Sequence, residues 1–216
     1  MISSRVRLVI IVAVLTVMAA GIARLLLVSQ SQPRQGGWDQ RPLEGLATFG
    51  AVPEFSLVER SGRQVKLSDF QGKIWLANFI YTNCKDSCPL QSAEIAKLQN
   101  EMGNRSDFEF VSISVDPEHD TPEVLSRYAE HFKADPRRWL FLTGDKNEIY
   151  RLAQEGFRLS AVPASEKEAQ ETDVILHSSR FVLVDGKGQI RGYYDSTDAE
   201  AVKRLRHDIR VLISTR

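Results

Sequence analysis

The stretch IWLANFIYTNCKDSCP, residues 74–89, decides the fold that we expect for this chain of 216 residues. Ile74–Tyr81 is a continuous apolar and aromatic run, which is typical of a strand covered on both faces of its sheet. Residues 89–102 then carry apolar side chains at helical spacing and end at a glycine, which suits a helix C-terminus. Cys84 and Cys88 are the only cysteines of the chain, and this pattern puts them on a strand-to-helix turn.

Strands and helices alternate along the chain after this turn. The further strands that we expect are Phe108–Val115, Trp139–Leu142, Arg180–Asp185 and Gln189–Asp195, and the further helices begin after Thr121 and cover Asp145–Gly156 and Thr197–Ser214. The polar residues 160–173 have no periodicity and are expected to form a loop. βα units followed by a hairpin and a helix predict an α/β fold, namely a thioredoxin-like, three-layer domain with a mixed central sheet.

The N-terminal residues predict a membrane anchor. Residues 8–28 contain an apolar run of about 21 residues, interrupted only by Arg24, which is long enough to cross a bilayer core of roughly 30 Å. Arg5 and Arg7 precede the run, so the positive-inside rule predicts a single-pass inner-membrane protein with a cytoplasmic N-terminus. The globular domain would then be periplasmic, or would lie in the equivalent mitochondrial intermembrane space. The alternative is a cleaved signal peptide, because residues 19–23 are small enough for a peptidase.

A tether and one domain are expected after the anchor, which we assign to residues 1–28. Residues 29–50 are rich in Gln, Gly and Pro and read as a flexible tether, and residues 51–216 are expected to form the domain.

The charged residues are unevenly distributed. The first 32 residues hold three arginines and no acid, which leaves 25 basic and 28 acidic side chains in the rest. This net charge of −3 gives no reason to expect nucleic-acid binding. Export would put the cysteines in a compartment where disulfides persist.

The spacing of the two cysteines is compatible with two kinds of chemistry. Side chains four residues apart on a first helical turn have Cβ atoms roughly 6 Å apart, so the thiols can close a disulfide or hold a soft metal ion. Thiolates select Cu(I) and also satisfy Zn(II). We expect the helix N-terminus and Lys85 to lower the pKa of both thiols. A purely structural disulfide would close a very short loop and stabilise the fold little.

Two residues elsewhere in the chain are candidates for the same site. His177 precedes the expected strand Arg180–Asp185 at the end of the polar loop, and it can supply an imidazole nitrogen to a metal held by the cysteines. Asp116 ends a buried strand and is followed by proline, so it either promotes chain reversal or orients the cysteine turn and presents charge to a partner. The remaining histidines, which we expect at the surface, are His119, His131 and His207.

Three motifs together resemble the Sco/SenC family, and the resemblance covers roughly Val52 to Ile213. The motifs are Cys84-Lys85-Asp86-Ser87-Cys88-Pro89, VDPEHDTPEVL at residues 115–125, and His177-Ser178. Members of this family are membrane-tethered copper chaperones of thioredoxin-like fold that assemble the binuclear copper centre of cytochrome c oxidase. The resemblance implies that Cys84, Cys88 and His177 bind copper, chiefly as Cu(I) and with the histidine also as Cu(II). It also implies a copper-accepting oxidase subunit, a copper donor protein and a thiol reductant as partners.

A thiol–disulfide oxidoreductase is the alternative function. Lys85 stands where the family usually has proline, and Leu176 stands where it often has an acidic residue. A cation beside the thiolates favours redox chemistry, in which Cys84 would attack and Cys88 would resolve. However, redox thioredoxins use C-x-x-C and carry a proline before the facing strand, and this chain has neither feature. A peroxiredoxin-type peroxidase is disfavoured because Tyr81 occupies the position of its usual Thr or Ser. Copper delivery, without turnover of a substrate, is therefore the preferred prediction.

Overall fold

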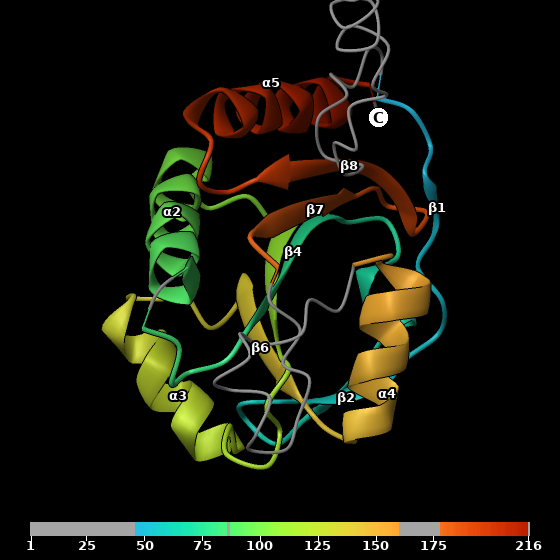
Figure 1. Ribbon diagram of the computed structural model, residues 1–216. Coiled ribbons are helices and arrows are strands. Elements are labelled where there is room, and N and C mark those ends of the chain that lie inside the picture. Colours follow the sequence, from blue (N-terminus) through green and yellow to red (C-terminus); the bar gives the residue numbers. More distant parts are fainter. Residues whose placement is uncertain (1–45, 86, 160–177, 216) are drawn as a thin grey trace, which may run out of the picture. The chain divides into compact units, whose positions relative to one another are not determined.

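The computed structural model describes residues 46–85, 87–159 and 178–215 (Figure 1). The chain divides into two compact units, residues 1–37 and 38–216, and every described residue belongs to the second unit. The predicted anchor, most of the predicted tether and His177 lie outside the described residues. Within the described ranges, no helix combines the length and the apolarity that a membrane span requires.

A mixed sheet runs through the middle of the described unit. In the part of the chain that the structure describes, its eight strands follow the order β1-β8-β7-β4-β5-β6-β2-β3. The strands are β1 (Gly50–Ala51), β2 (Ser56–Glu59), β3 (Gln64–Lys66), β4 (Ile74–Ile80), β5 (Phe108–Ser114), β6 (Trp139–Thr143), β7 (Arg180–Val184) and β8 (Gln189–Asp195). Strands β4, β5 and β6 are parallel to one another. The antiparallel strands β7, β8 and β1 extend the sheet on one side, and β2 and β3 extend it on the other.

The three parallel strands form the centre of the sheet and are buried on both faces. Every residue of β4, β5 and β6 is buried. Parallel neighbours need a crossover connection, which is usually a helix. Here α2 (Ser87–Met102) connects β4 to β5, and α3 (Pro122–His131) connects β5 to β6. The loops that follow β4 and β5 therefore lie at the same edge of the sheet, and the first of them carries Cys84.

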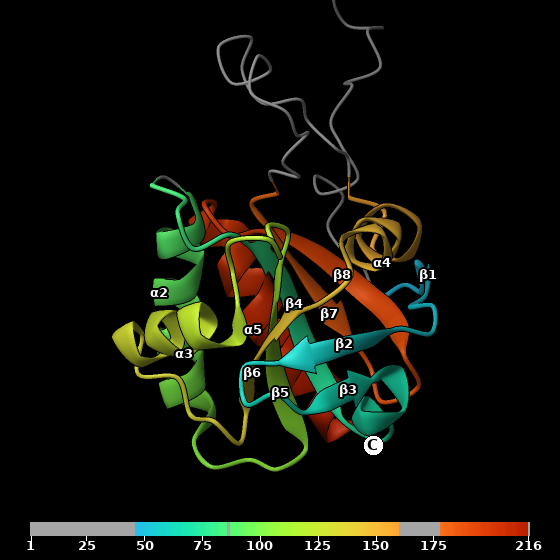
Figure 2. The same cartoon turned by 90° about the horizontal axis from the view of Figure 1, so that it is seen from below.

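Helices cover both faces of the sheet (Figures 1 and 2). The remaining helical elements are the 3-10 helix η2 (Leu67–Phe70), α4 (Lys146–Arg151), the π-helical turn η3 (Leu152–Gly156) and α5 (Ala199–Ser214). Helices α2, α3 and α5 pack on one face, where Ile95, Leu125 and Leu205 are fully buried. Helix α4 and η3 pack on the other face through Ile149 and Leu152. The predicted three-layer α/β arrangement with a mixed sheet is confirmed.

The starts of α2 and α3 differ in how well the sequence predicts them. Helix α3 begins as predicted, with Thr121 as its N-cap: the Thr121 hydroxyl accepts a hydrogen bond from the Val124 amide, and Pro122 is the first helical residue. Helix α2 begins at Ser87, two residues earlier than predicted. This earlier start places Cys88 inside the first helical turn rather than before it.

The strands β1, β2 and β3 are absent from the sequence-based prediction. Each is only two to four residues long, too short to show a clear hydrophobic period. Pairing with residues distant in sequence holds them in place, as where Val58 of β2 lies opposite Thr143 of β6. Such pairings depend on tertiary structure and leave little trace in the local sequence.

The folded unit begins earlier than the predicted boundary at residue 51. Leu46, which the sequence assigned to the tether, is buried against the face that carries α5, and its carbonyl accepts a hydrogen bond from the Arg191 guanidinium. Phe49 packs edge-on against Tyr193 with ring centroids 5.5 Å apart. The last residues of the predicted tether therefore contact the domain through Leu46 and Phe49.

Candidate functional site

The cysteine pair lies where β4 ends and α2 begins. The backbone turns sharply after β4, and the Cys84 amide donates to the Tyr81 carbonyl at 3.1 Å. Cys84 lies in this turn and is 6% exposed, whereas Cys88 lies in the first turn of α2 and is 5% exposed. Both cysteines are thiols, with no disulfide between them. The two side chains are close enough for a hydrogen bond between the thiols.

Burial dominates the electrostatics of Cys88. The pKa of the Cys88 thiol is raised to about 12, chiefly by loss of solvent and in smaller part by the neighbouring Cys84 thiol. Hydrogen bonds from the Tyr81 backbone and from Ser87 act in the opposite direction but are outweighed. The expectation that the helix N-terminus and Lys85 lower the pKa of both thiols is therefore wrong for Cys88. Lys85 is exposed, and solvent screens its charge.

A tyrosine from α3 closes the inner side of the site. The Tyr128 hydroxyl lies 3.0 Å from the Ser92 hydroxyl of α2. Burial is the main cause that raises the pKa of Tyr128, and the charges of Cys88, Cys84 and Asp120 add to it. The cysteine pair is thus surrounded by α2, α3 and the loops after β4 and β5, a largely dry environment in which ligand exchange with water is restricted.

A buried carboxylate joins the two loops at this edge of the sheet. Asp120, in the loop between β5 and α3, is completely buried. Its carboxylate accepts hydrogen bonds from the Thr82 amide at 3.1 Å, from the Thr82 hydroxyl at 2.5 Å and from the Ser114 hydroxyl at 2.5 Å. Thr82 is only two residues before Cys84. Asp120 is absent from the site residues that the sequence predicts, although it stands directly before the N-cap Thr121.

Asp116 lies in a chain reversal, one of the two roles that the sequence offers for it, and its backbone carbonyl accepts from the amides of His119 and Asp120. Its carboxylate contacts the exposed imidazole of His119 at 2.8 Å. This pairing raises the pKa of His119, first through the hydrogen bond and then through the charge of Asp116. The hydrogen-bonded carboxylate that reaches the cysteine turn is that of Asp120. His119, His131 and His207 are all exposed, as predicted.

A chain of buried hydrogen bonds leads from the sheet to the residue that follows His177. The Trp139 indole donates to the Ser112 hydroxyl at 2.9 Å, and this hydroxyl donates to the Asn78 carbonyl oxygen at 2.8 Å. The Asn78 amide donates to Gln91 of α2 at 2.9 Å. The Gln91 amide then donates to the backbone carbonyl of Ser178 at 2.7 Å. The start of the segment that enters β7 is therefore attached to the same helix that carries Cys88.

The structure leaves the predicted three-ligand set incomplete. Among residues 46–85, 87–159 and 178–215, no group of three or more His, Cys, Asp or Glu side chains converges as a metal site. His177 lies outside these ranges, so its distance from the thiols is not described. The two thiols that are described form the soft donor pair that Cu(I) prefers, and the chemistry of the donors fits this ion.

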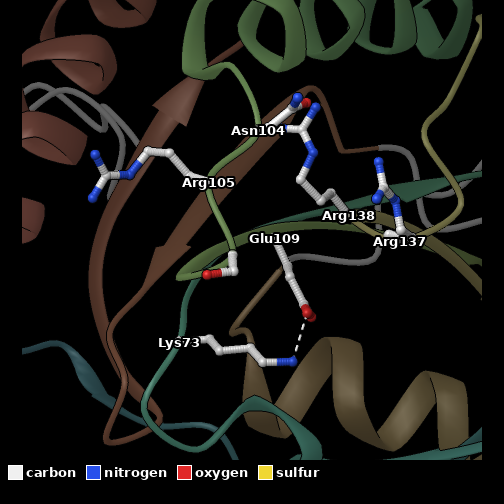
Figure 3. Close-up of a pocket in the computed structure, with 7 residues that line it drawn as sticks. Lys73, Asn104, Arg105, Glu109, Arg137 and Arg138 are labelled. Atoms are coloured by element: carbon white, nitrogen blue, oxygen red, sulfur yellow. Dashed lines mark hydrogen bonds and ion pairs between the residues drawn. The ribbon is translucent and has the colours of Figure 1, made fainter.

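A cavity lies at the end of the parallel strands opposite to the cysteines (Figure 3). It has a volume of about 420 Å³ and is lined by Lys73, Asn104, Arg105, Ser106, Glu109, Arg137 and Arg138. These residues precede or begin the parallel strands, whereas the cysteines follow the carboxyl end of β4. The charged groups of the cavity are already paired: Lys73 contacts Glu109 at 2.6 Å, and Arg105 forms two hydrogen bonds with Asp107. The cysteine edge is therefore the better candidate for function.

Known proteins match this chain over the whole described unit. Residues 46–214 match the family model described as SCO1/SenC. The SCO1 protein homolog of Bacillus subtilis (strain 168) is 32% identical over 161 residues, which cover 74% of this chain and 81% of the relative.

Solved structures agree with this match. BsSco, described as a member of the Sco family of cytochrome c oxidase assembly proteins with a disulfide switch, is 30% identical with a TM-score of 0.64, over 76% of this chain and 94% of its own. Bradyrhizobium japonicum ScoI with copper bound is 28% identical with a TM-score of 0.59, over 73% of this chain and 98% of its own. The mixed α/β sheet with its helical layers is thus the fold of these thioredoxin-like Sco structures.

Proposed function

The chain belongs to the SCO1/SenC family, and from this premise we propose that it is a membrane-anchored copper chaperone for cytochrome c oxidase. In this proposal Cys84, Cys88 and His177 bind copper, which the chain delivers to the binuclear copper site of the oxidase. The relatives support copper binding and a role in oxidase assembly, because ScoI has been solved with copper bound and BsSco belongs to a family of oxidase assembly proteins.

The observation that carries the proposal is the pair of neighbouring buried thiols at the strand-to-helix turn. Two thiolates hold Cu(I) well, because this ion accepts low coordination and soft donors. Cys88 is protonated at neutral pH, since its pKa is raised to about 12. Cu(I) therefore displaces a proton when it binds, and a rise in pH strengthens binding. Transfer to the acceptor would proceed by ligand exchange, with the acceptor's ligands replacing one thiolate at a time.

The third ligand in this proposal is His177, which is adjacent to Ser178 in the sequence. The hydrogen bond from Gln91 to the Ser178 carbonyl supports this choice, because it attaches the neighbouring residue to α2. An imidazole nitrogen suits Cu(II) as well as Cu(I), whereas two thiolates alone suit Cu(I). We therefore expect His177 to contribute more to Cu(II) binding than to Cu(I) binding.

The proposed cellular setting follows from the N-terminal sequence. Residues 1–28 would anchor the chain in the inner membrane with the N-terminus in the cytoplasm, and the copper-binding domain would be periplasmic. The predicted tether, residues 29–50, would join this anchor to the domain, against which its residues Leu46 and Phe49 pack. A copper donor protein and a thiol reductant would load the site and keep it reduced, and a subunit of the oxidase would accept the copper.

Copper titration of the full chain in detergent, under reducing conditions, tests the proposal. We expect one Cu(I) per chain, and a loss of affinity of at least a hundredfold in both Cys84→Ser and Cys88→Ser. His177→Ala should abolish the visible absorption of the Cu(II) form, whereas His207→Ala, which alters an exposed histidine of α5, should leave it unchanged. The proposal fails if the reduced chain binds no Cu(I), or if either serine variant keeps the wild-type affinity.

A thiol–disulfide oxidoreductase is the second candidate, and the hydrogen bond between the two thiols favours it. Thiols within hydrogen-bond reach of each other need only a short movement to form a disulfide. In this function Cys84 would attack a substrate disulfide and Cys88 would resolve the mixed disulfide. A disulfide-reductase assay on the metal-free chain distinguishes the two functions: activity that Cys84→Ser abolishes supports the redox function, and its absence supports copper delivery alone.

A further inference from the structure

We propose that Asp120 is a positioning residue for the cysteine pair, which acts by fixing Thr82 and thereby the turn that carries Cys84. The proposal rests on the proposed copper-binding function for its biological meaning. Its structural part, the control of the Cys84 thiol by Asp120, can be tested without copper.

The geometry joins three segments of the chain at one carboxylate. Thr82 belongs to the turn after β4, Ser114 is the last residue of β5, and Asp120 lies just before α3. The carboxylate accepts from the Thr82 amide and hydroxyl and from the Ser114 hydroxyl, at distances between 2.5 and 3.3 Å. The cysteine turn is therefore attached to the end of the neighbouring strand as well as to its own strand.

The turn depends on such an attachment because regular pairing ends at Ile80. That residue still accepts from the Val115 amide at 2.8 Å, but β4 stops there and α2 begins only at Ser87. Between them, the Cys84 amide donates a hydrogen bond to the Tyr81 carbonyl at 3.1 Å. The two hydrogen bonds from Thr82 to Asp120 fix the intervening backbone and so restrict where the Cys84 thiol points.

A carboxylate suits this position better than an amide. Three donor groups converge on Asp120, and a carboxylate only accepts hydrogen bonds, whereas asparagine carries one acceptor oxygen and one donor group. The Thr82 amide can only donate, so it needs the acceptor oxygen. With asparagine at position 120, at least one of the two hydroxyls would therefore have to turn and accept a hydrogen bond from the side-chain amide. Asp120 is enclosed by its donors and fully buried, which makes it a support for the site and not a ligand.

The variants Asp120→Asn and Thr82→Val test the inference in the full chain in detergent. Thr82→Val removes only the hydroxyl contact, Thr82→Ser restores it, and Asp116→Asn is the matched control because it changes a carboxylate of the same loop that contacts His119 instead. The first readout is the iodoacetamide alkylation rate of each cysteine in the metal-free chain. The second readout is Cu(I) affinity measured by competition with a chelator, and urea unfolding measures stability in parallel.

The inference predicts a selective change at Cys84. Asp120→Asn and Thr82→Val should accelerate alkylation of Cys84 at least threefold relative to Cys88, which α2 holds, and should weaken Cu(I) binding about tenfold or more. Thr82→Ser and Asp116→Asn should stay within twofold of the wild type. A merely structural role would change both cysteines equally, in proportion to the loss of stability.

Each other outcome gives a definite answer. If Asp120→Asn or Thr82→Val is folded and keeps the wild-type ratio of alkylation rates, the inference is wrong. If Asp120→Asn does not fold, Thr82→Val and its serine rescue decide the question. If the wild type binds no Cu(I), the proposed function fails, while the alkylation ratio still decides the role of Asp120.

Discussion

Burial of the Cys88 thiol should make this cysteine nearly inert to alkylation near neutral pH. Only the thiolate reacts, and the pKa of Cys88 is raised to about 12. A cysteine of ordinary pKa, about 8.5, is roughly one-quarter thiolate at pH 8, whereas a thiol with a pKa of about 12 is about one ten-thousandth thiolate. The thiolate fraction of Cys88 is therefore on the order of a thousandfold lower in the folded chain than in the unfolded chain at this pH, and we expect its alkylation to be slower by up to this factor.

The pH dependence of the rate separates this electrostatic effect from simple shielding. The reduced full chain is alkylated with iodoacetamide at a series of pH values from about 7 to about 10, and the modification is then read by mass spectrometry. Trypsin cleaves after Lys85, so Cys84 and Cys88 are measured on different peptides. The Cys88 rate should rise about tenfold per pH unit with no plateau, because the whole range lies below its pKa. The same chain in urea is the control, and its rate should level off above about pH 9.

A plateau for folded Cys88 below about pH 9.5 would refute this reasoning. It would mean that the N-terminus of α2 and Lys85 stabilise the thiolate more than burial destabilises it.

The direction of the Cys88 pKa shift also has a consequence for folding. The unfolded chain ionises Cys88 near pH 8.5 and the folded chain near pH 12, so the contribution of Cys88 to stability is complete below about pH 8.5 and is lost as the pH rises through this window.

Three further predictions concern other parts of the fold. Ser112→Ala should lower the free energy of unfolding by about 2–4 kcal/mol in urea titrations, because it leaves two buried polar partners unsatisfied; a loss below about 0.5 kcal/mol would contradict the buried hydrogen-bond chain. Asp116→Asn should lower the pKa of His119 toward about 6.5 in an NMR titration, because the Asp116 carboxylate stabilises the protonated imidazole. Gly156→Ala should destabilise the fold by roughly 1–3 kcal/mol in thermal unfolding, because its Cβ would lie 2.7 Å from the rigid ring of Pro53; an unchanged melting temperature would count against this tight contact.

The central sheet was predictable because its strands are buried on both faces. The runs that become β4, β5 and β6 are rich in apolar and aromatic residues, and the capping pattern at Thr121 predicts the start of α3. The edge strands were not predictable in the same way. Strand β2 is held by antiparallel pairing with β6, in which Val58 lies opposite Thr143, and its four residues contain no signal that identifies this partner.

The residues of the candidate site also divide into those that local sequence predicts and those that only tertiary contacts bring together. Cys84 and Cys88 are close in sequence, and the turn that carries them follows from a strand that ends and a helix that begins, so their neighbourhood could be inferred directly. Asp120 is 36 residues after Cys84 in the chain, and its contact with Thr82 requires that the loops after β4 and β5 meet at one edge. The sequence favoured Asp116 instead, because it follows the strand more closely, but only the path of the loop decides which carboxylate turns inward.

The sequence by itself determined that two thiols would stand together at the end of a buried strand, because local spacing fixes local geometry. The tertiary structure alone decided their chemical state. A positive side chain and a helix N-terminus beside a cysteine predict a lowered pKa, and the sequence offers both, at Lys85 and at the helix predicted from residue 89. The folded chain removes solvent from Cys88 and leaves Lys85 exposed, and the loss of hydration outweighs the nearby charge. Burial depends on α3 and the loop after β5 as much as on the cysteine turn, so no local pattern could have predicted it.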